Sequence, residues 1–267
     1  MKYKDGTFFK TCPERLREKV MYNHHTGREY VAYYPKGYDV IEYFNSGSQV
    51  NVSTVMQRKT GKIMLLKNED QHYTSTRGAI KREMQVSHLI EKCMKPSHAP
   101  NVPKVIEGAY LCQDPVRSYL IEEQIAGYQL TLGLFNDLSR NKQKFVLTEL
   151  AKNLGKMHFW IPDRCLKLSG FVIDTGGFYP PPLPEYRKHE QLQPILDSKK
   201  LSLVHNDLAP ANILYDGTTL SILDYGRACV SSRSLDLVKI QQNYSDEFAA
   251  RFLNAYIRVC EPYKARW

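Results

Sequence analysis

The feature that most constrains this chain is a pair of polar segments, set between apolar ones, in residues 204–226. Residues 204–214 have the sequence VHNDLAPANIL, and residues 223–226 have the sequence LDYG. Asp207 precedes Asn212 by five residues, and Asp224 follows Asn212 by twelve. Apolar residues flank both segments, which is typical of short buried strands that lead into loops. The pattern predicts a loop that carries Asp207 and Asn212, and a nearby turn that carries Asp224.

These side chains supply what the transfer of a phosphoryl group requires. One group must orient the attacking hydroxyl and accept its proton, and oxygen ligands must hold the Mg²⁺ ions that bridge the phosphates. Asp207 would be the base, Asn212 a metal ligand and Asp224 the main metal ligand. Alternatively, Asp207 and Asn212 only cap local backbone in turns. The presence of His205 with all three at these spacings favours the catalytic interpretation.

The two segments resemble the catalytic loop and the metal motif of the protein-kinase superfamily, H-x-D-x-x-x-x-N and D-F-G. The loop from His205 to Asn212 is most similar to the aminoglycoside and choline phosphotransferase branch, whose loop has the pattern H-G-D-L-x-P-x-N. Asp224-Tyr225-Gly226 is closer to protein kinases, and small atypical kinases also stop soon after this motif. The resemblance implies an α+β, two-lobed protein-kinase-like fold that uses ATP and Mg²⁺, with His205 as a packing residue that shapes the loop.

The resemblance extends into the first half of the chain. Residues 45–52 (NSGSQVNV) align with the glycine-rich phosphate loop of kinases but keep only its middle glycine, Gly47. By this alignment Gly47 and Ser48 would approach the phosphates, and Val52 would cover the base. Lys67 ends an apolar segment fifteen residues after Val52, where the family has the lysine that binds the α- and β-phosphates. A solvated lysine at a strand end is the alternative.

A lysine in that role needs a carboxylate partner. Glu83 follows Lys67 by sixteen residues and shares a helix face with apolar side chains, so we expect it, rather than Glu91, to pair with Lys67. The resemblance also implies that the backbone carbonyl of Glu123 and the N–H of Ile125 bind the adenine.

Asp236 has two interpretations, which the sequence leaves open. An Asp at a similar place in the family bonds the backbone of the catalytic loop. Asp236 also lies two residues after Ser234, and both residue types are common at the start of a helix.

Apolar patterns predict how the chain is divided. Five strands with one inserted helix come first, and helices dominate afterwards. We expect an N-terminal extension at 1–37, a nucleotide-binding N-lobe with a five-stranded antiparallel sheet at 38–124, and a mostly helical C-lobe at 125–267 that holds the catalytic and acceptor-binding residues. The resemblance covers residues 38–255, and within the extension residues 13–22 are expected to form a short helix.

Composition and charge narrow the classes of partner. Lys and Arg outnumber Asp and Glu by 37 to 28, for a net charge of +9. This surplus fits an anionic ligand such as a nucleotide, and no Lys/Arg run is long enough to indicate a nucleic-acid partner. No apolar stretch is long enough to predict a signal peptide or a membrane span, so we expect a cytoplasmic protein. The six cysteines form no C-x-x-C pair, and we expect free thiols.

The leading hypothesis is an ATP- and Mg²⁺-dependent phosphotransferase that moves the γ-phosphate to a hydroxyl of a small molecule. The acceptor would bind between Asp207 and the Gly- and Pro-rich residues 161–185. One alternative is an atypical protein kinase without a long activation loop. Another is a non-catalytic, nucleotide-binding pseudokinase scaffold, although a scaffold has no need of Lys67 together with Asp207, Asn212 and Asp224.

Overall fold

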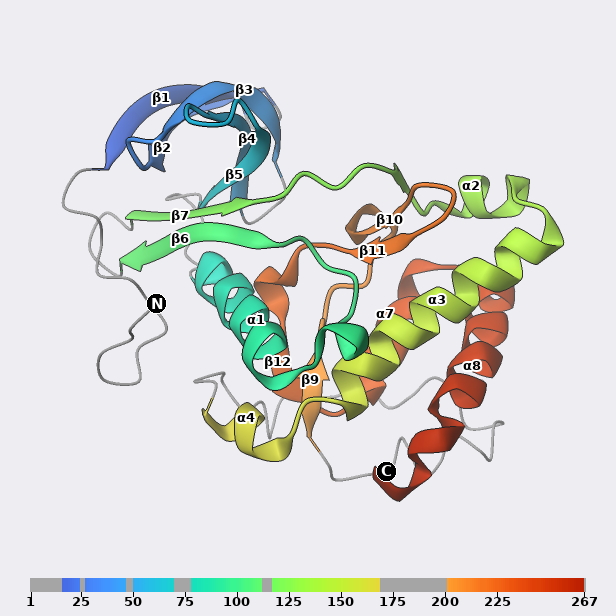
Figure 1. Cartoon of the computed structure of the whole chain (residues 1–267). Coiled ribbons are helices and arrows are strands. Elements are labelled where there is room, and N and C mark those ends of the chain that lie inside the picture. Colours follow the sequence, from blue (N-terminus) through green and yellow to red (C-terminus); the bar gives the residue numbers. More distant parts are fainter. Residues whose placement is uncertain are drawn as a thin grey trace. The chain divides into compact units, whose positions relative to one another are not determined.

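The computed structural model describes residues 16–24, 27–46, 50–69, 78–111, 117–168 and 201–266 (Figure 1). These residues belong to two compact units. Unit 1 contains the described residues up to His88 together with Pro103–Gln124, and unit 2 contains Leu89–Val102 and the described residues from Ile125 onward.

Unit 1 is built on a five-stranded antiparallel sheet with the strand order β3-β4-β5-β7-β6. The strands are β3 (Tyr38–Ser46), β4 (Val50–Gln57), β5 (Ile63–Glu69), β6 (Val105–Leu111) and β7 (Arg117–Glu122). Helix α1 (Ala79–Cys93) follows β5 in the sequence, and its last residues, from Leu89, belong to unit 2. The expected five-stranded antiparallel sheet with one inserted helix is therefore confirmed.

Helix α1 covers one face of this sheet. Ile80 packs with Val50 and Leu120 in a buried cluster. Gly108 on β6 permits the close approach, because a Cβ atom there would lie only 3.1 Å from the sulfur of Met84 on the helix. A larger residue at this position would require the neighbouring side chains, Met84 among them, to shift.

The opposite face of the sheet is covered by a hairpin of β1 (Arg17–Asn23) and β2 (Arg28–Tyr34). Alternate residues of β2, Tyr30 and Tyr34 among them, join a core that includes Tyr119 and Ile121. Tyr119 and Ile121 alternate with Leu120, so this core lies on the face that α1 does not cover.

The expected helix at residues 13–22 is wrong in the part that the structure describes, since Arg17–Asn23 is a strand. The short segment has weak periodicity of its own, and pairing with β2 decides its conformation. Polar groups then fix the hairpin on the sheet: Asn23 Nδ2 donates to Asn51 Oδ1 at 2.6 Å, and the hydroxyls of Tyr30 and Ser53 lie 2.7 Å apart.

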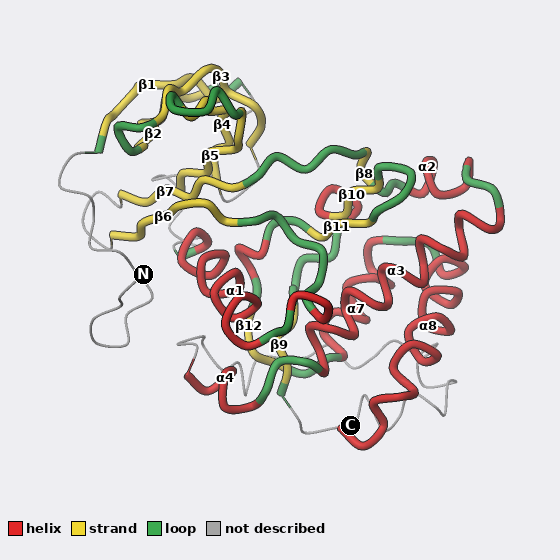
Figure 2. The backbone as a smooth tube through the Cα atoms, in the orientation of Figure 1, coloured by secondary structure: helices red, strands yellow, loops and turns green. Residues whose placement is uncertain are grey.

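Unit 2 combines helices with two small sheets (Figure 2). One sheet has the order β11-β10-β8 and the other pairs β12 with β9. The strands are β8 (Tyr128–Gln129), β9 (Ser202–Val204), β10 (Ile213–Tyr215), β11 (Leu220–Ile222) and β12 (Cys229–Ser231). The helices are α2 (Leu132–Asp137), α3 (Arg140–Phe159), α4 (Asp163–Leu168), α7 (Ser234–Asn243) and α8 (Asp246–Cys260).

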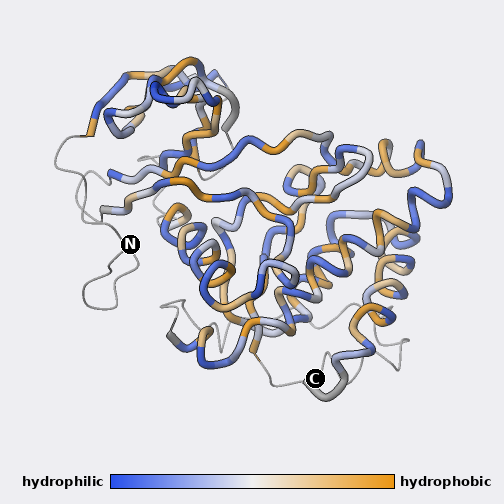
Figure 3. Tube along the Cα trace, in the orientation of Figure 1, coloured by the Kyte–Doolittle hydropathy of each residue, from blue (hydrophilic) through white to orange (hydrophobic). Residues whose placement is uncertain are grey.

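Helices α3 and α8 begin at serine caps and pack against one another. The hydroxyl of Ser139 accepts from the backbone N–H of Lys142, and that of Ser245 accepts from Phe248, which satisfies donors that a helix start leaves open. Apolar residues recur at helical spacing along α8, with polar residues between them (Figure 3), as expected for a helix with one buried face. None of the described helices has the length and hydrophobicity needed to cross a bilayer.

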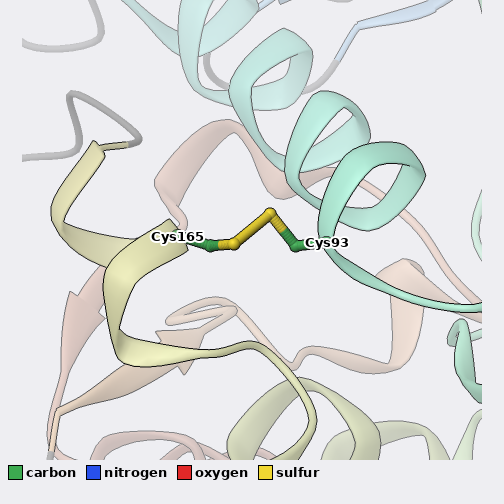
Figure 4. Close-up of a disulfide and its surroundings, with 2 residues drawn as sticks. All are labelled: Cys93 and Cys165. Atoms are coloured by element: carbon green, nitrogen blue, oxygen red, sulfur yellow. A yellow bond between two sulfur atoms is a disulfide. The ribbon is translucent and has the colours of Figure 1, made fainter.

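A disulfide joins Cys93, at the end of α1, to Cys165 in α4 (Figure 4). The expectation of free thiols is therefore wrong for this pair. The two residues lie 72 apart in the sequence, where no motif links them, and the fold brings their Cα atoms to 6.5 Å, which is within reach of a disulfide. Of the other cysteines, Cys229 and Cys260 are not disulfide-bonded, and Cys12 and Cys112 lie outside the described residues.

Reduction of this disulfide is expected to lower the stability of the protein by about 2–4 kcal/mol, because the crosslink restricts the unfolded chain. The measurement is thermal denaturation with and without a phosphine reductant. Replacing Cys93 with Ser should lower Tm and abolish its dependence on reductant, whereas replacing Cys229, which is not disulfide-bonded, with Ser should preserve that dependence. An identical Tm for the oxidised and reduced protein would contradict the prediction.

Candidate active site

Two strand pairs bring the polar loops of unit 2 together. Residues 205–212 connect β9 to β10, and residues 223–228 connect β11 to β12. Strand β12 pairs with β9, and β11 pairs with β10. Both loops therefore run between the same two strand pairs. The loops are thus neighbours, although ten residues of strand and turn separate them in the sequence.

His205 ties these two loops to each other. Its side chain is fully buried, and its Nε2 lies 2.7 Å from the carbonyl oxygen of Leu223. Its Nδ1 accepts the backbone N–H of Asp207 at 3.2 Å. These partners assign the proton of a neutral imidazole to Nε2. The ring also packs on that of Tyr225, with centroids 4.6 Å apart, so His205 shapes the loop as the sequence predicted.

Asp207 and Asn212 are held at opposite ends of a short backbone turn. Asn212 Nδ2 donates to the carbonyl oxygen of Asp207 at 2.8 Å, and the carbonyl of Asn212 accepts the N–H of Leu223 at 2.8 Å. The side chain of Asp207 remains 27% exposed, and Arg227 Nε lies 3.8 Å from its Oδ2. The carboxylate is therefore accessible and has a cationic neighbour, Arg227, which the sequence had not indicated.

Asp224 has a left-handed backbone conformation, with φ 59° and ψ 71°, and its Oδ1 accepts the N–H of Gly226 at 3.3 Å. Asn206 has φ 62°. Among the described residues, these two are the only non-glycine residues with positive φ. Such conformations cost energy and gather at functional sites, where the surrounding structure enforces them. Both lie in the loops that carry the predicted catalytic residues.

The carboxylate of Asp236, in the first turn of α7, binds the backbone of the loop that carries Asp207. It is fully buried and accepts the backbone N–H of His205 at 2.9 Å and that of Asn206 at 2.7 Å. Of the two interpretations of Asp236, the structure therefore supports the one in which it bonds the backbone of the catalytic loop. These bonds also hold Asn206 in its left-handed conformation.

His158, at the end of α3, completes this buried network. Its Nε2 lies 3.1 Å from Asp236 Oδ2, and its Nδ1 lies 2.6 Å from the hydroxyl of Tyr256. Burial lowers the pKa of His158, and Asp236 offsets this only in part. Burial raises the pKa of Tyr256 well above its ordinary value. The tyrosine therefore donates to a neutral imidazole, which in turn donates to Asp236. Burial alone would raise the pKa of Asp236, but its interactions with His158 and His205 hold it below its ordinary value.

This network predicts a loss of stability in mild acid. The pKa of His158 lies below its ordinary 6.5 in the folded state, so the unfolded chain binds the proton more readily. The contribution of His158 to the free energy of unfolding is therefore complete above pH 6.5. It decreases as the pH falls below that value, by up to about 1.4 kcal/mol per pH unit. Asp236 acts in the same direction, at pH values below its ordinary 3.8.

The variant H158Q retains a donor toward Asp236 but does not titrate. Chemical denaturation between about pH 7.5 and pH 5.5 should show a smaller loss of stability for H158Q than for the wild type. The matched variant H98Q changes a histidine that is not fully buried and should keep the wild-type slope. Equal slopes for H158Q and the wild type would show that His158 is not the group responsible.

Lys67 lies in unit 1, on the face of the sheet that α1 covers. Its Nζ lies 2.8 Å from Glu83 Oε2, so the expected pairing is present, while Glu91 is exposed. Lys67 is itself buried, which excludes the alternative of a solvated strand-end lysine. A second carboxylate, Glu122, also contacts Nζ, at 2.9 Å. This contact was not predicted from the sequence, although a charged residue directly after the apolar residues 119–121 was a signal.

Strand β5 holds α1 at a second point. Glu69, two residues after Lys67, accepts the backbone N–H of Ile80 at 3.0 Å, and its carboxylate also interacts with the N–H groups of Gly78 and Ala79. A carboxylate at a helix start satisfies open donors and complements the helix dipole. Burial raises the pKa of Glu69, and these hydrogen bonds partly offset the effect.

The remaining predicted residues are placed as follows. Val52 lies in β4 directly opposite Lys67 on β5. Glu123, in unit 1, donates its backbone N–H to the carbonyl of Lys104 at 3.0 Å, and Ile125 is a partly buried residue at the start of the last segment of unit 2. Gly47, Ser48 and residues 169–185 of the predicted acceptor region lie outside the described residues.

Asn212 and Asp224 fit the requirements of a magnesium ion. A carboxylate and an amide oxygen are ligands that Mg²⁺ accepts, with phosphate oxygens and water completing its shell. Because Asn212 donates through Nδ2 to Asp207, its Oδ1 is the atom suited to a cation. The part of the chain that the structure describes contains no group of three His, Cys, Asp or Glu side chains able to hold a metal.

Comparison with known proteins identifies a matching family model and structures of similar fold. Residues 177–266 match the model of the phosphotransferase enzyme family (APH). The fold is similar to that of aminoglycoside 2'-phosphotransferase-IIIa in its GDP complex, with a TM-score of 0.60 and 15% identity over 85% of this chain and 81% of that one. It is also similar to APH(2'')-Ib bound to ADP, with a TM-score of 0.56 and 19% identity over 85% and 81%.

A third similar structure is the ternary complex of APH(2'')-IIa with streptomycin and ATP, with a TM-score of 0.55 and 18% identity over 84% of this chain and 82% of that one. No curated protein sequence matches the chain. The expected resemblance to the protein-kinase-like superfamily, and within it to the aminoglycoside phosphotransferase branch, is confirmed.

Proposed function

We propose that this chain, which has the fold of aminoglycoside phosphotransferases, moves the γ-phosphoryl group of ATP to a hydroxyl of a small molecule with the help of Mg²⁺. The observation that carries the proposal is the pair of braced loops in unit 2. Asp207, Asn212 and Asp224 lie on neighbouring loops that His205 and Asp236 fix by buried hydrogen bonds. Such preorganisation is what phosphoryl transfer demands of a protein.

Each side chain has a distinct role in this proposal. Asp207, accessible to solvent, orients the acceptor hydroxyl and accepts its proton. Asn212 and Asp224 hold Mg²⁺, which supplies charge neutralisation on the phosphates when bound. Lys67, positioned by Glu83, binds the α- and β-phosphates. The backbone groups of the hinge residues, the carbonyl of Glu123 and the N–H of Ile125, bind the adenine, and their side chains need not take part.

A small-molecule acceptor is favoured over a protein by the segment that follows Asp224. Protein kinases have a long activation segment and an A-P-E motif after D-F-G. Here β12 begins at Cys229 and α7 at Ser234, so little chain separates Asp224 from the next helix. The similar APH(2'')-IIa structure contains streptomycin and ATP, which is consistent with a small polar acceptor for this chain.

The test is transfer of radiolabelled γ-phosphate from ATP in the presence of Mg²⁺, with a cell extract divided into protein and small-molecule fractions. Label in the small-molecule fraction is the expected result. Label on protein alone would instead identify an atypical protein kinase. Intact binding of Mg-ATP without any transfer would identify a nucleotide-binding scaffold.

Two variants should separate the predicted roles. D207N should lower kcat by about 10²- to 10⁴-fold while the Kd for Mg-ATP is unchanged, because it removes the proton acceptor and not a nucleotide ligand. D224N should weaken nucleotide binding in the presence of Mg²⁺ and have little effect on binding measured with EDTA. Isothermal titration gives Kd and phosphate transfer gives kcat.

The matched control for both variants is D216N. Asp216 has the same charge and lies in the same unit, but its carboxylate caps the turn at Thr218 and Thr219. D216N should retain wild-type kcat and Kd. Normal turnover by D207N would remove Asp207 from the role of base.

A further inference from the structure

Lys67 in unit 1 is held by two buried carboxylates. Its Nζ atom lies 2.8 Å from Oε2 of Glu83 and 2.9 Å from Oε1 of Glu122. The side chains of Lys67, Glu83 and Glu122 are only 7%, 4% and 6% exposed. The kinase-like pattern accounts for the first carboxylate only, so the contact with Glu122 requires its own explanation.

The register of the sheet places Glu122 at this position. Lys67 on β5 lies directly opposite Leu120 on β7. Because side chains alternate between faces, Glu122 is on the same face as Leu120 and lies diagonal to Lys67. Glu83 approaches the same ammonium from α1. Two independent elements, a neighbouring strand and a helix, therefore restrain the head group.

The charges of this cluster are not balanced for phosphate binding. With both carboxylates ionised, the three side chains together carry one formal negative charge. A nucleotide phosphate near Lys67 adds further negative charge, so Glu122 opposes nucleotide binding. Buried ion clusters are also weak contributors to stability, because desolvation consumes most of the Coulomb attraction. Neither affinity nor stability accounts for a second carboxylate here.

The need to fix the position of the Lys67 ammonium explains the second carboxylate better. A lysine head group is a compact charge on a flexible four-carbon stem. Anchoring it from two directions fixes Nζ, and misplacement of a catalytic group by about 1 Å can cost on the order of 100-fold in rate. The benefit would appear in the transition state, where the position of the charge matters most.

We propose that Glu122 is a positioning residue, which fixes the Lys67 ammonium for phosphoryl transfer and thereby weakens nucleotide binding in the ground state. This inference rests on the proposed function, in which Lys67 binds the nucleotide phosphates. The charge of Glu122 sets the affinity, and the reach of its side chain sets the rate.

Two conservative variants separate charge from reach. E122Q removes the charge but keeps an oxygen acceptor at the same distance along the side chain. It should lower the Kd for Mg-ATP about three- to tenfold and change kcat by less than about threefold. E122D keeps the charge but is one methylene shorter. It should lower kcat about 10- to 100-fold and leave Kd unchanged.

The experiment measures Kd by isothermal titration with Mg-ATP, and kcat as phosphate released from Mg-ATP to water, which requires no knowledge of the acceptor. The matched control is E107Q. Glu107 lies on β6 of the same sheet and accepts from the Tyr119 hydroxyl at 3.1 Å, so the variant removes an equal charge without touching Lys67. It should keep wild-type Kd and kcat.

A purely structural role gives a different result. In that case E122Q and E122D lower Tm, and Kd and kcat deteriorate together in both variants. That outcome, or wild-type values in both, would overturn the proposal.

A second measurement keeps the inference separate from the proposed function. Lys67 is labelled with an amine-reactive ester, and the modified peptide is quantified by mass spectrometry against the exposed Lys62 in the same sample. Loosening the ammonium should raise labelling of Lys67 about tenfold in E122D, whose shorter side chain no longer reaches it. If the wild type neither binds nor hydrolyses Mg-ATP, the proposed function fails. Unchanged labelling then also refutes the positioning role of Glu122, whereas raised labelling retains Glu122 as the residue that positions Lys67.

Discussion

The second unit depends on one buried carboxylate. Asp236 is fully inaccessible to solvent. It accepts hydrogen bonds from the backbone N–H groups of the two residues directly before Asp207. A buried charge is tolerated only where such donors replace water. In return, the carboxylate holds Asn206 in a conformation that a non-glycine residue rarely adopts. Because Asp207 directly follows Asn206, these hydrogen bonds also restrain the backbone from which its side chain projects.

Unit 1 is also organised around a buried charged side chain, here the ammonium of Lys67. Lys67 is buried and meets carboxylates from α1 and β7, and two residues further along β5 Glu69 binds the first turn of α1. One strand thus fixes the helix by two polar contacts on the face where apolar packing is limited to a small cluster. Apolar burial holds the helix on the sheet, and these directional contacts set its register along the strand.

Much of this arrangement could be predicted from local patterns. Alternation of apolar residues identified the five strands of the sheet, and the spacing of Asp207, Asn212 and Asp224 identified the loops, since both signals lie within short stretches of chain. The hairpin at 17–34 was missed because its pairing, rather than its own periodicity, makes it a strand. Glu122 was missed because its partner lies on a neighbouring strand, far away in the sequence.

The sequence by itself determined which candidate catalytic side chains the chain carries, because a motif requires only residue types at fixed short spacings. It settled which carboxylates and amides are available and that a lysine follows the apolar residues of β5. The tertiary structure alone decided which of these groups meet: Asp236 with the N–H of His205, Glu122 with Lys67, and Cys93 with Cys165. These contacts join residues tens of positions apart, and strand register and helix packing over the whole unit, which no local pattern encodes, determine whether they form.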